Sequence, residues 1–120
     1  MIERTETSET PATGCCSPNL APRIDAATAH ALSDDLGILA HPIRLQILDL
    51  LAQHNGQVCV CDLEAALPVK QPTVSHHLRL LRAAGMIDCE RRGLWAYYFV
   101  RRPALEALRT RLLAQFDALR

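Results

Sequence analysis

Residues 61–85 constrain the fold most, because they predict two short helices joined by a tight turn. Apolar residues have helical spacing in CDLEAAL (61–67), and the two prolines of LPVKQP (67–72) interrupt the pattern. Helical spacing resumes in TVSHHLRLLRAAG (73–85), which ends at a glycine, a typical C-terminal cap. A short helix, a turn and a second helix form a helix-turn-helix, and we expect this motif here.

The spacing of apolar residues changes from helical to strand-like directly after the second helix. MIDCERRGLWAYYFV (86–100) is rich in aromatic and β-branched residues and predicts two strands, roughly 86–91 and 95–100, around a turn at Arg92-Gly93. A hairpin that follows a recognition helix is a wing. The predicted fold class is therefore mainly α with a small β-hairpin, a winged helix-turn-helix that dimerises through its terminal helices.

Three further helices are predicted before the helix-turn-helix. IDAATAHAL (24–32) indicates the first, and Ser33 is placed to cap a second one that begins at Asp34. His41-Pro42 breaks the chain and starts a third, because proline is best tolerated at a first helical position. Asn55-Gly56 ends that helix.

The C-terminal segment 103–119 is amphipathic and carries more apolar surface than so small a chain needs for its own core. At 120 residues the chain has room for one core. We expect residues 1–20, which contain Pro11, Gly14 and Pro18, to form a flexible N-terminal arm. Residues 21–120 are expected to form a winged helix-turn-helix DNA-binding and dimerisation domain, with the terminal helix meeting a second subunit.

The formal net charge is zero, but its distribution is uneven. Residues 1–66 hold three basic and nine acidic residues, a net charge of −6, whereas residues 67–120 hold ten basic and four acidic residues, a net charge of +6. A basic half suggests a surface for a polyanion such as DNA. No apolar run approaches the ~20 residues of a membrane span, and the start lacks the apolar core of a signal peptide. We expect a cytoplasmic protein with no membrane partner.

Four of the five cysteines occur in pairs. Cys15 and Cys16 are adjacent, Cys59 and Cys61 have one residue between them, and Cys89 stands alone. We expect Cys89 to be a small, half-buried apolar residue. In a reducing compartment, clustered thiols indicate metal binding or redox chemistry rather than a disulfide framework. The absence of a Cys-X-X-Cys sequence and of an alternating α/β pattern argues against a thiol reductase or another enzyme.

Cys59 and Cys61 can face one ion only where the backbone is irregular. An extended strand would direct the two thiols to opposite faces, and a regular helix would separate them by about 200°. Both residues lie between the turn at Gly56 and the helix DLEAAL, where the backbone enters the helix. A helix N-terminus also favours the thiolate, the form that binds metal.

Four segments together resemble the ArsR/SmtB family of bacterial metal-sensing winged-helix repressors. The segments are LAHPIRLQILDLL, VCVCDL, QPTVSHHLRLLRAAGMI and RRGLWAYY, and the similarity runs from about residue 30 to about residue 102. The QPTVSHHLRLL segment is specific for the family, and CVCDL for its thiolate-sensing members. The resemblance implies a homodimer that represses a resistance operon and leaves its operator DNA when a toxic ion binds.

The helix-turn-helix and the wing supply the candidate DNA contacts. The residues expected to contact operator DNA are Lys70, Gln71, Thr73, Ser75, His76, Arg79, Arg91 and Arg92. Those on the recognition helix can meet base edges, and the basic ones beside it and in the wing can meet phosphates. Adjacent helical residues point about 100° apart, so only one of His76 and His77 is expected to face DNA, and we select His76.

Two thiolates are too few for a tight metal site. Arsenic-sensing members of the family often carry a third cysteine inside the same helix, which this chain lacks, whereas others complete the site from an N-terminal arm. The resemblance therefore implies a site drawn from Cys15, Cys16, Cys59 and Cys61. Soft ligands and a three-sulfur set favour arsenic(III) or antimony(III) as inducer, with cadmium or lead on four cysteines as the alternative. No organic cofactor is expected.

A second alternative is a thiol redox switch, in which an arm cysteine pairs with Cys59 or Cys61 on oxidation and DNA is released without a metal. A constitutive DNA-binding protein is a third, although it leaves four clustered thiols unexplained. In the metal-sensing hypothesis, the ion alters the first helix of the helix-turn-helix and thereby moves the recognition helix.

Overall fold

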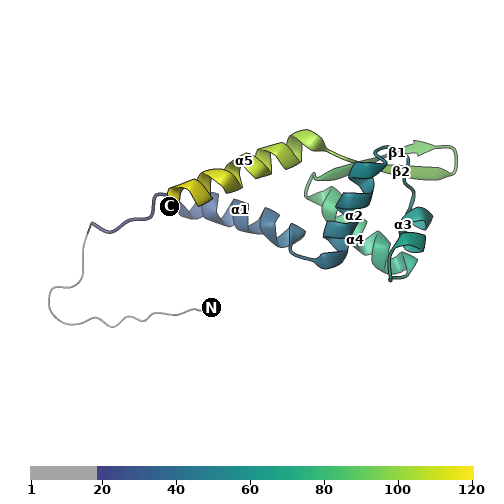
Figure 1. The fold of residues 1–120 in the computed structure, drawn as a ribbon, viewed down its shortest axis with the longest axis horizontal. Helices are drawn as coiled ribbons and strands as arrows, with labels where there is room; N and C mark the ends of the chain where they lie inside the picture. The colour runs from purple at the N-terminus through teal and green to yellow at the C-terminus, as the bar shows by residue number, and fades with distance from the viewer. Residues whose placement is uncertain (1–18) are drawn as a thin grey trace.

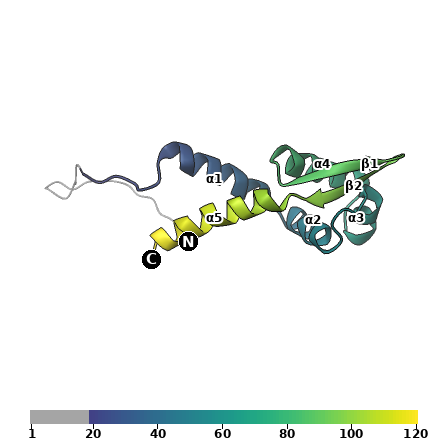
Figure 2. The same cartoon turned by 90° about the horizontal axis from the view of Figure 1, so that it is seen from above.

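A computed structural model describes residues 19–120. Within these residues five helices and one two-stranded antiparallel sheet form two parts (Figure 1). The elements are α1 (Ala26–Leu39), α2 (Pro42–Gln53), α3 (Val60–Ala66), α4 (Gln71–Ala83), β1 (Ile87–Arg92), β2 (Trp95–Val100) and α5 (Arg102–Ala118). We call α2, α3, α4 and the hairpin the head, and α1 with α5 the helix pair. In both views the helix pair extends away from the head (Figures 1 and 2).

The helix-turn-helix and the wing are present, which confirms the predicted mainly α fold with a small β-hairpin; dimerisation through the terminal helices stays a prediction. α3 and α4 are the two helices of the motif, and Gly85 follows α4 with a positive φ of 79°. β1 starts one residue later than predicted, and the antiparallel register pairs Arg92 with Trp95 across a two-residue turn. The turn is therefore Gly93-Leu94, where the glycine takes a positive φ of 64° that suits a tight hairpin.

The N-terminal part contains one helix where the sequence predicts two. α1 is continuous, and its N-cap is Asp25, whose carboxylate accepts a hydrogen bond from the Thr28 amide at 2.7 Å. The prediction of a cap at Ser33 is wrong, because no proline or glycine interrupts residues 26–36 and the backbone keeps its helical hydrogen bonds through the serine. The predicted restart at Pro42 is confirmed.

The segment between α2 and α3 is attached to the wing. Val58 forms a bridge to Tyr98, whose amide donates to the Val58 carbonyl at 2.7 Å. The Asn55 side chain accepts from the Val100 amide at 2.6 Å, and the Arg92 guanidinium donates to the Gly56 carbonyl at 2.6 Å. Residues 55–58 thus lie against the hairpin and are hydrogen-bonded to it. The sequence pattern does not predict this contact.

The core lies inside the head. Its fully buried side chains are Ile47, Leu51, Leu63, Val74, Leu78, Leu81 and Ile87. The helix pair buries much less, chiefly Leu32 and Leu108, and an ion pair of 2.7 Å joins Arg111 to Asp35 across it. None of the helices in residues 19–120 is long and apolar enough to span a lipid bilayer.

Candidate thiol site and nucleic-acid interface

Cys59 and Cys61 come together at the N-terminus of α3. Cys59 is the N-cap residue, with extended backbone angles of φ −102° and ψ 174°, and Cys61 lies in the first turn. This change from extended to helical backbone brings the two sulfur atoms to within 2.9 Å of each other, as free cysteines. Cys59 is buried and Cys61 is exposed, so one thiol lies under the surface and the other opens to solvent.

Asp62 is a third potential ligand that the sequence analysis did not select. Its carboxylate accepts hydrogen bonds from the Cys59 amide at 3.1 Å and from the Cys59 thiol at 3.3 Å. Ligand atoms of Cys59, Cys61 and Asp62 all lie within 4.8 Å of one another. The signal that could have identified Asp62 is its spacing, because an acidic residue three positions after an N-cap commonly closes a capping box.

The protonation of Cys59 differs from the expectation for a helix N-terminus. Burial raises the pKa of Cys59, and its hydrogen bond with the Cys61 thiol raises it further. The hydrogen bond that the Asp62 backbone amide donates to the Cys59 sulfur lowers the pKa of Cys59, but the effect of burial is larger. The thiol form is therefore favoured in the ion-free protein, and binding of a soft ion would release a proton from this residue.

The thiol pair opens into a groove between α3, the start of α4 and the wing. The groove has a volume of about 500 Å³. Its lining includes Cys59, Cys61, Gln71, Arg91, Leu94 and Trp95. Trp95 keeps 55% of its surface exposed and Leu94 keeps 91%. Two candidate DNA contacts, Gln71 and Arg91, thus share one hollow with the two candidate metal ligands.

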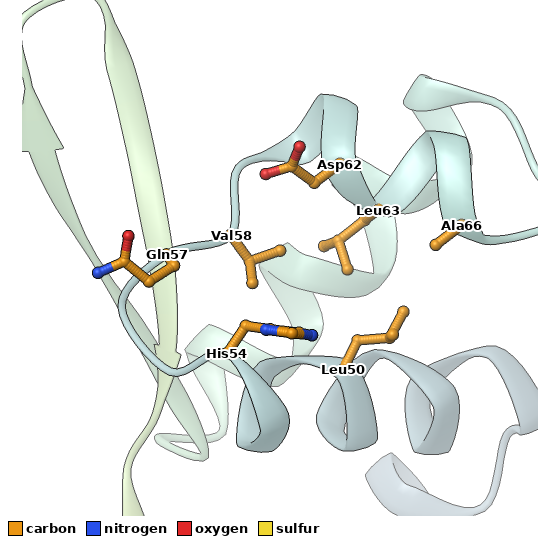
Figure 3. Close-up of a pocket in the computed structure, with 7 residues that line it drawn as sticks. All are labelled: Leu50, His54, Gln57, Val58, Asp62, Leu63 and Ala66. Atoms are coloured by element: carbon orange, nitrogen blue, oxygen red, sulfur yellow. The ribbon is translucent and has the colours of Figure 1, made fainter.

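A second cavity of about 330 Å³ lies between α2 and α3 (Figure 3). Leu50 of α2 and His54, which follows α2, face Leu63 and Ala66 of α3 across it, and Val58 also lines the cavity. The Asp62 carboxylate at its rim is engaged by Cys59. The walls of this cavity are mainly aliphatic.

The recognition helix α4 presents its polar residues to solvent. Gln71, Thr73, His76 and Arg79 are exposed and Ser75 is half-buried. The Arg79 guanidinium lies 3.2 Å from a ring nitrogen of His76, so two candidate base contacts form one polar cluster. The apolar side of α4 faces the core.

His77 points the other way and is 5% exposed. Its Nδ1 accepts a hydrogen bond from Arg44 Nε at 3.1 Å, and its ring centroid lies 4.4 Å from that of His41. Burial lowers the pKa of His77, and the nearby His41, Arg44 and His76 lower it further. The choice of His76 over His77 as the outward residue agrees with this burial; its contact with DNA stays a prediction.

The basic residues beside the recognition helix are exposed but differ in their contacts. Arg92 is held by the protein: its guanidinium donates to the Gly56 carbonyl and stacks 4.5 Å above the centre of the Tyr97 ring. Lys70, the N-cap residue of α4, and Arg91 form no ion pair within residues 19–120. Arg92 therefore has less freedom than Lys70 and Arg91 to reach a phosphate.

The remaining cysteines are not part of the observed cluster. Cys89 is half-buried on β1, as its isolated position in the sequence predicts. Cys15 and Cys16 lie outside the described residues, and their participation in a metal site stays a prediction.

Comparisons with known proteins agree on one family. The family described as "Bacterial regulatory protein, arsR family" matches residues 41–88. The putative arsenical resistance operon repressor ArsR2 of Halobacterium salinarum is 36% identical over 87 residues, which cover 70% of this chain and 69% of that protein. The arsenical resistance operon repressor of Escherichia coli is 46% identical over 61 residues, which cover 51% of each chain. The chain spans about half the length of several curated relatives that it matches.

A solved structure supports the same assignment. The homodimeric winged helix-turn-helix DNA-binding domain Mb0332 of Mycobacterium bovis is 31% identical, with a TM-score of 0.58 over 85% of this chain and 90% of that chain. The helix-turn-helix, the wing and the sequence similarity over more than two thirds of a curated relative lead to one conclusion. The chain belongs to the ArsR family of bacterial regulatory proteins.

Proposed function

We propose that the chain is a homodimeric, DNA-binding transcriptional repressor of a metalloid-resistance operon, and that arsenic(III) or antimony(III) releases it from its operator. The observation that carries this proposal is the thiol pair, Cys59 and Cys61, with sulfur atoms 2.9 Å apart at the entry to the helix-turn-helix. Two curated relatives are named as arsenical resistance operon repressors, one of them as putative, and these names support arsenic as the element that is sensed.

The DNA contacts would come from the exposed face of α4 and from the wing. Gln71, Thr73, Ser75, His76 and Arg79 would lie along the major groove, and Lys70, Arg91 and Arg92 would bind phosphates. Two copies of α4 are needed to read paired half-sites. The exposed Leu113, Phe116 and Leu119 of the C-terminal region support a dimer interface on the helix pair.

The donor set suits a soft, thiophilic ion. Cys59 and Cys61 supply two sulfur ligands, and a third would come from Cys15 or Cys16 of the N-terminal arm. When bound, arsenic(III) or antimony(III) cross-links these sulfurs and thereby fixes the entry to α3. Cys59 would lose its thiol contact with Asp62, so the cap of α3 would rearrange at the same time.

Two connections could carry this change to the DNA surface. α3 packs directly against α4 in the helix-turn-helix. The segment 55–58, which immediately precedes Cys59, is hydrogen-bonded to β2 through Val58 and Tyr98. A shift at the thiols would therefore reach both the recognition helix and the wing. Allosteric coupling of about 1–3 kcal/mol, or roughly 5- to 150-fold in affinity, is sufficient for release.

Fluorescence anisotropy of the reduced, full-length protein on its own promoter DNA tests the proposal. Arsenite and antimonite at low concentration should release the protein, whereas cadmium, lead and zinc should not. Cys59→Ser and Cys61→Ser should bind the operator and fail to respond, with Cys89→Ser as the matched control that responds normally. Loss of operator binding by the ion-free Cys59→Ser and Cys61→Ser variants would instead make these cysteines structural.

Two other outcomes would replace this inducer. Release by cadmium or lead, lost when Cys15 and Cys16 are both changed to serine, would indicate the four-cysteine site. Release by peroxide under strict chelation would indicate a thiol redox switch.

A further inference from the structure

We propose that Arg44 and His77 are positioning residues for operator reading, because their contact fixes the orientation of the recognition helix α4 relative to the helix pair. Neither residue lines the groove beside the thiols, and neither is among the candidate DNA contacts. The inference rests on the proposed function for DNA binding by a dimer, and it is independent of the ion that is sensed.

His77 is the only polar or charged side chain that is buried within residues 19–120. It projects from α4 toward α2, where its Nδ1 accepts a hydrogen bond from Arg44 Nε at 3.1 Å. Its buried neighbours on the same helix, among them Val74 and Leu78, are apolar, so packing alone does not require an imidazole there. A buried hydrogen bond adds modest net stability, but it restricts the neighbouring helices to the arrangement in which the bond forms.

The Arg44 side chain connects three helices. Its Nε donates to His77 on α4, and its Nη1 donates to the Ile38 carbonyl at 3.1 Å. Ile38 lies in the last turn of α1, where carbonyl groups have no partner within the helix. Because a guanidinium is planar, it fixes the directions of both hydrogen bonds at once, which the ammonium of a lysine does not. Arg44, a residue of α2, thus ties the recognition helix to the end of α1.

This link matters because the helix pair is joined to the head through short connections. Only Ala40 and His41 separate α1 from α2, and only Arg101 separates β2 from α5. In a dimer that forms through the helix pair, the angle between the pair and α4 sets the distance between two recognition helices. Paired half-sites require that distance to match about one turn of DNA. Loss of the contact should therefore weaken operator binding, whereas phosphate contacts, which bind any sequence, should change little.

The contact requires a neutral His77. Its Nδ1 accepts a hydrogen bond only while that nitrogen carries no proton, and protonation would place an imidazolium against the Arg44 guanidinium. The groups that face the ring are all basic: Arg44 from α2, His41 at the N-cap of α2 with ring centroids 4.4 Å apart, and His76 from its own helix at 5.5 Å. Burial, followed by these three groups, lowers the pKa of His77, so the ring is neutral at pH 7. Operator affinity should consequently fall as the pH drops below 6.5, the ordinary pKa of histidine.

Fluorescence anisotropy of the reduced, ion-free, full-length protein tests the inference, with its own promoter DNA compared with an unrelated duplex of equal length. Arg44→Lys keeps the charge and removes the planar group, and Arg109→Lys, at an exposed position of α5, is the matched control. His77→Leu removes the acceptor from the buried position, and His77→Asn restores an acceptor at the place of Nδ1. Circular dichroism checks that each protein is folded at every pH that is used, between 7.5 and 5.5.

We expect Arg44→Lys and His77→Leu to weaken promoter binding roughly 3- to 10-fold, with binding to the unrelated duplex within about twofold of wild type. His77→Asn should recover most of the affinity, and Arg109→Lys should bind both duplexes as wild type does. Promoter affinity relative to the unrelated duplex should fall in wild type as the pH drops below 6.5. This fall should be smaller in His77→Asn, which keeps the His76 imidazole on α4 but lacks the one that contacts Arg44.

Equal losses on both duplexes in Arg44→Lys would mean a general structural role and would overturn the inference. Unchanged promoter binding in Arg44→Lys, or the same pH profile in wild type and His77→Asn, would also overturn it. The proposed function fails differently. If wild type prefers its promoter, keeps it in the presence of arsenite and antimonite, and loses the preference in Arg44→Lys, then the inducer assignment is wrong and the positioning role stands. A wild-type protein with no preference for its promoter would contradict both.

Discussion

The head and the helix pair bury their apolar residues to very different extents. In the head, Ile47, Leu51 and Leu63 are completely covered by α2, α3, α4 and the hairpin. In the C-terminal region, Leu113, Phe116 and Leu119 are 43%, 56% and 76% exposed. The head thus completes its own core, whereas the helix pair leaves an apolar surface that a second copy of the chain would cover. This difference separates residues that stabilise the subunit from residues that we expect to hold two subunits together.

The largest effect is expected from a cavity in the head. Leu51→Ala removes a fully buried side chain and should lower the free energy of unfolding by about 2–5 kcal/mol. Urea denaturation followed by circular dichroism would measure the loss. Leu45→Ala on the same helix, at a position 53% exposed, is the control and should cost much less. Similar losses at both positions would contradict the picture of a head with its own closed core.

A change on the exposed face of α5 should instead act on the dimer. Phe116→Ala should weaken association by about 2–4 kcal/mol, or roughly 30- to 1,000-fold, because each substitution occurs twice in a symmetric interface. Sedimentation velocity over a range of concentrations would measure it. Ala114→Ser, a small change at an exposed position of the same helix, is the control. An unchanged dimer in Phe116→Ala would place the interface elsewhere.

Weakening the attachment of residues 55–58 to the wing should have a smaller effect. Asn55→Ala removes the acceptor of the hydrogen bond from the Val100 amide and should destabilise the head by about 1 kcal/mol. Release of DNA by arsenite should require more inducer in this variant, because the segment before Cys59 is less firmly attached to β2. Anisotropy titrations of the variant and of Gln57→Ala, a neighbouring exposed position, would separate coupling from general destabilisation. Equal inducer requirements would exclude this route.

Because His77 is buried in the head, we expect the stability of the protein to depend on pH. The pKa of His77 is lowered in the folded protein, so the unfolded chain takes up the proton more readily below the ordinary pKa of 6.5. Stability should be constant above that pH, fall as the pH drops from 6.5 toward the lowered pKa, and level off below it. Urea denaturation between pH 7.5 and 5 would show this slope.

Two variants would assign the slope to this residue. The slope should disappear in His77→Gln and persist in His76→Gln, because the His76 side chain is exposed whereas His77 is buried. A slope that survives in His77→Gln would mean that other groups are responsible, His41 being the nearest at 4.4 Å between ring centroids.

The sequence by itself determined the order and type of most elements. The prolines and glycines around residues 67–72 and 85 delimit the two helices of the motif, and the change to aromatic and β-branched residues marks the wing. The convergence of Cys59 and Cys61 was also predictable, because it depends on local backbone at a helix start. The predicted cap at Ser33 failed because a local capping preference is weaker than the backbone hydrogen bonds of an uninterrupted helix.

Only the tertiary structure decided which groups from distant parts of the chain surround the thiols. The pairing of Val58 with Tyr98, the contact of Arg92 with Gly56 and the groove that joins Cys61 to Trp95 all depend on how the hairpin folds back onto the start of α3. The raised pKa of Cys59 has the same origin, since burial by the head outweighs the local effect of the helix start. Local pattern sets the elements, whereas burial and long-range contacts set the chemistry of the site.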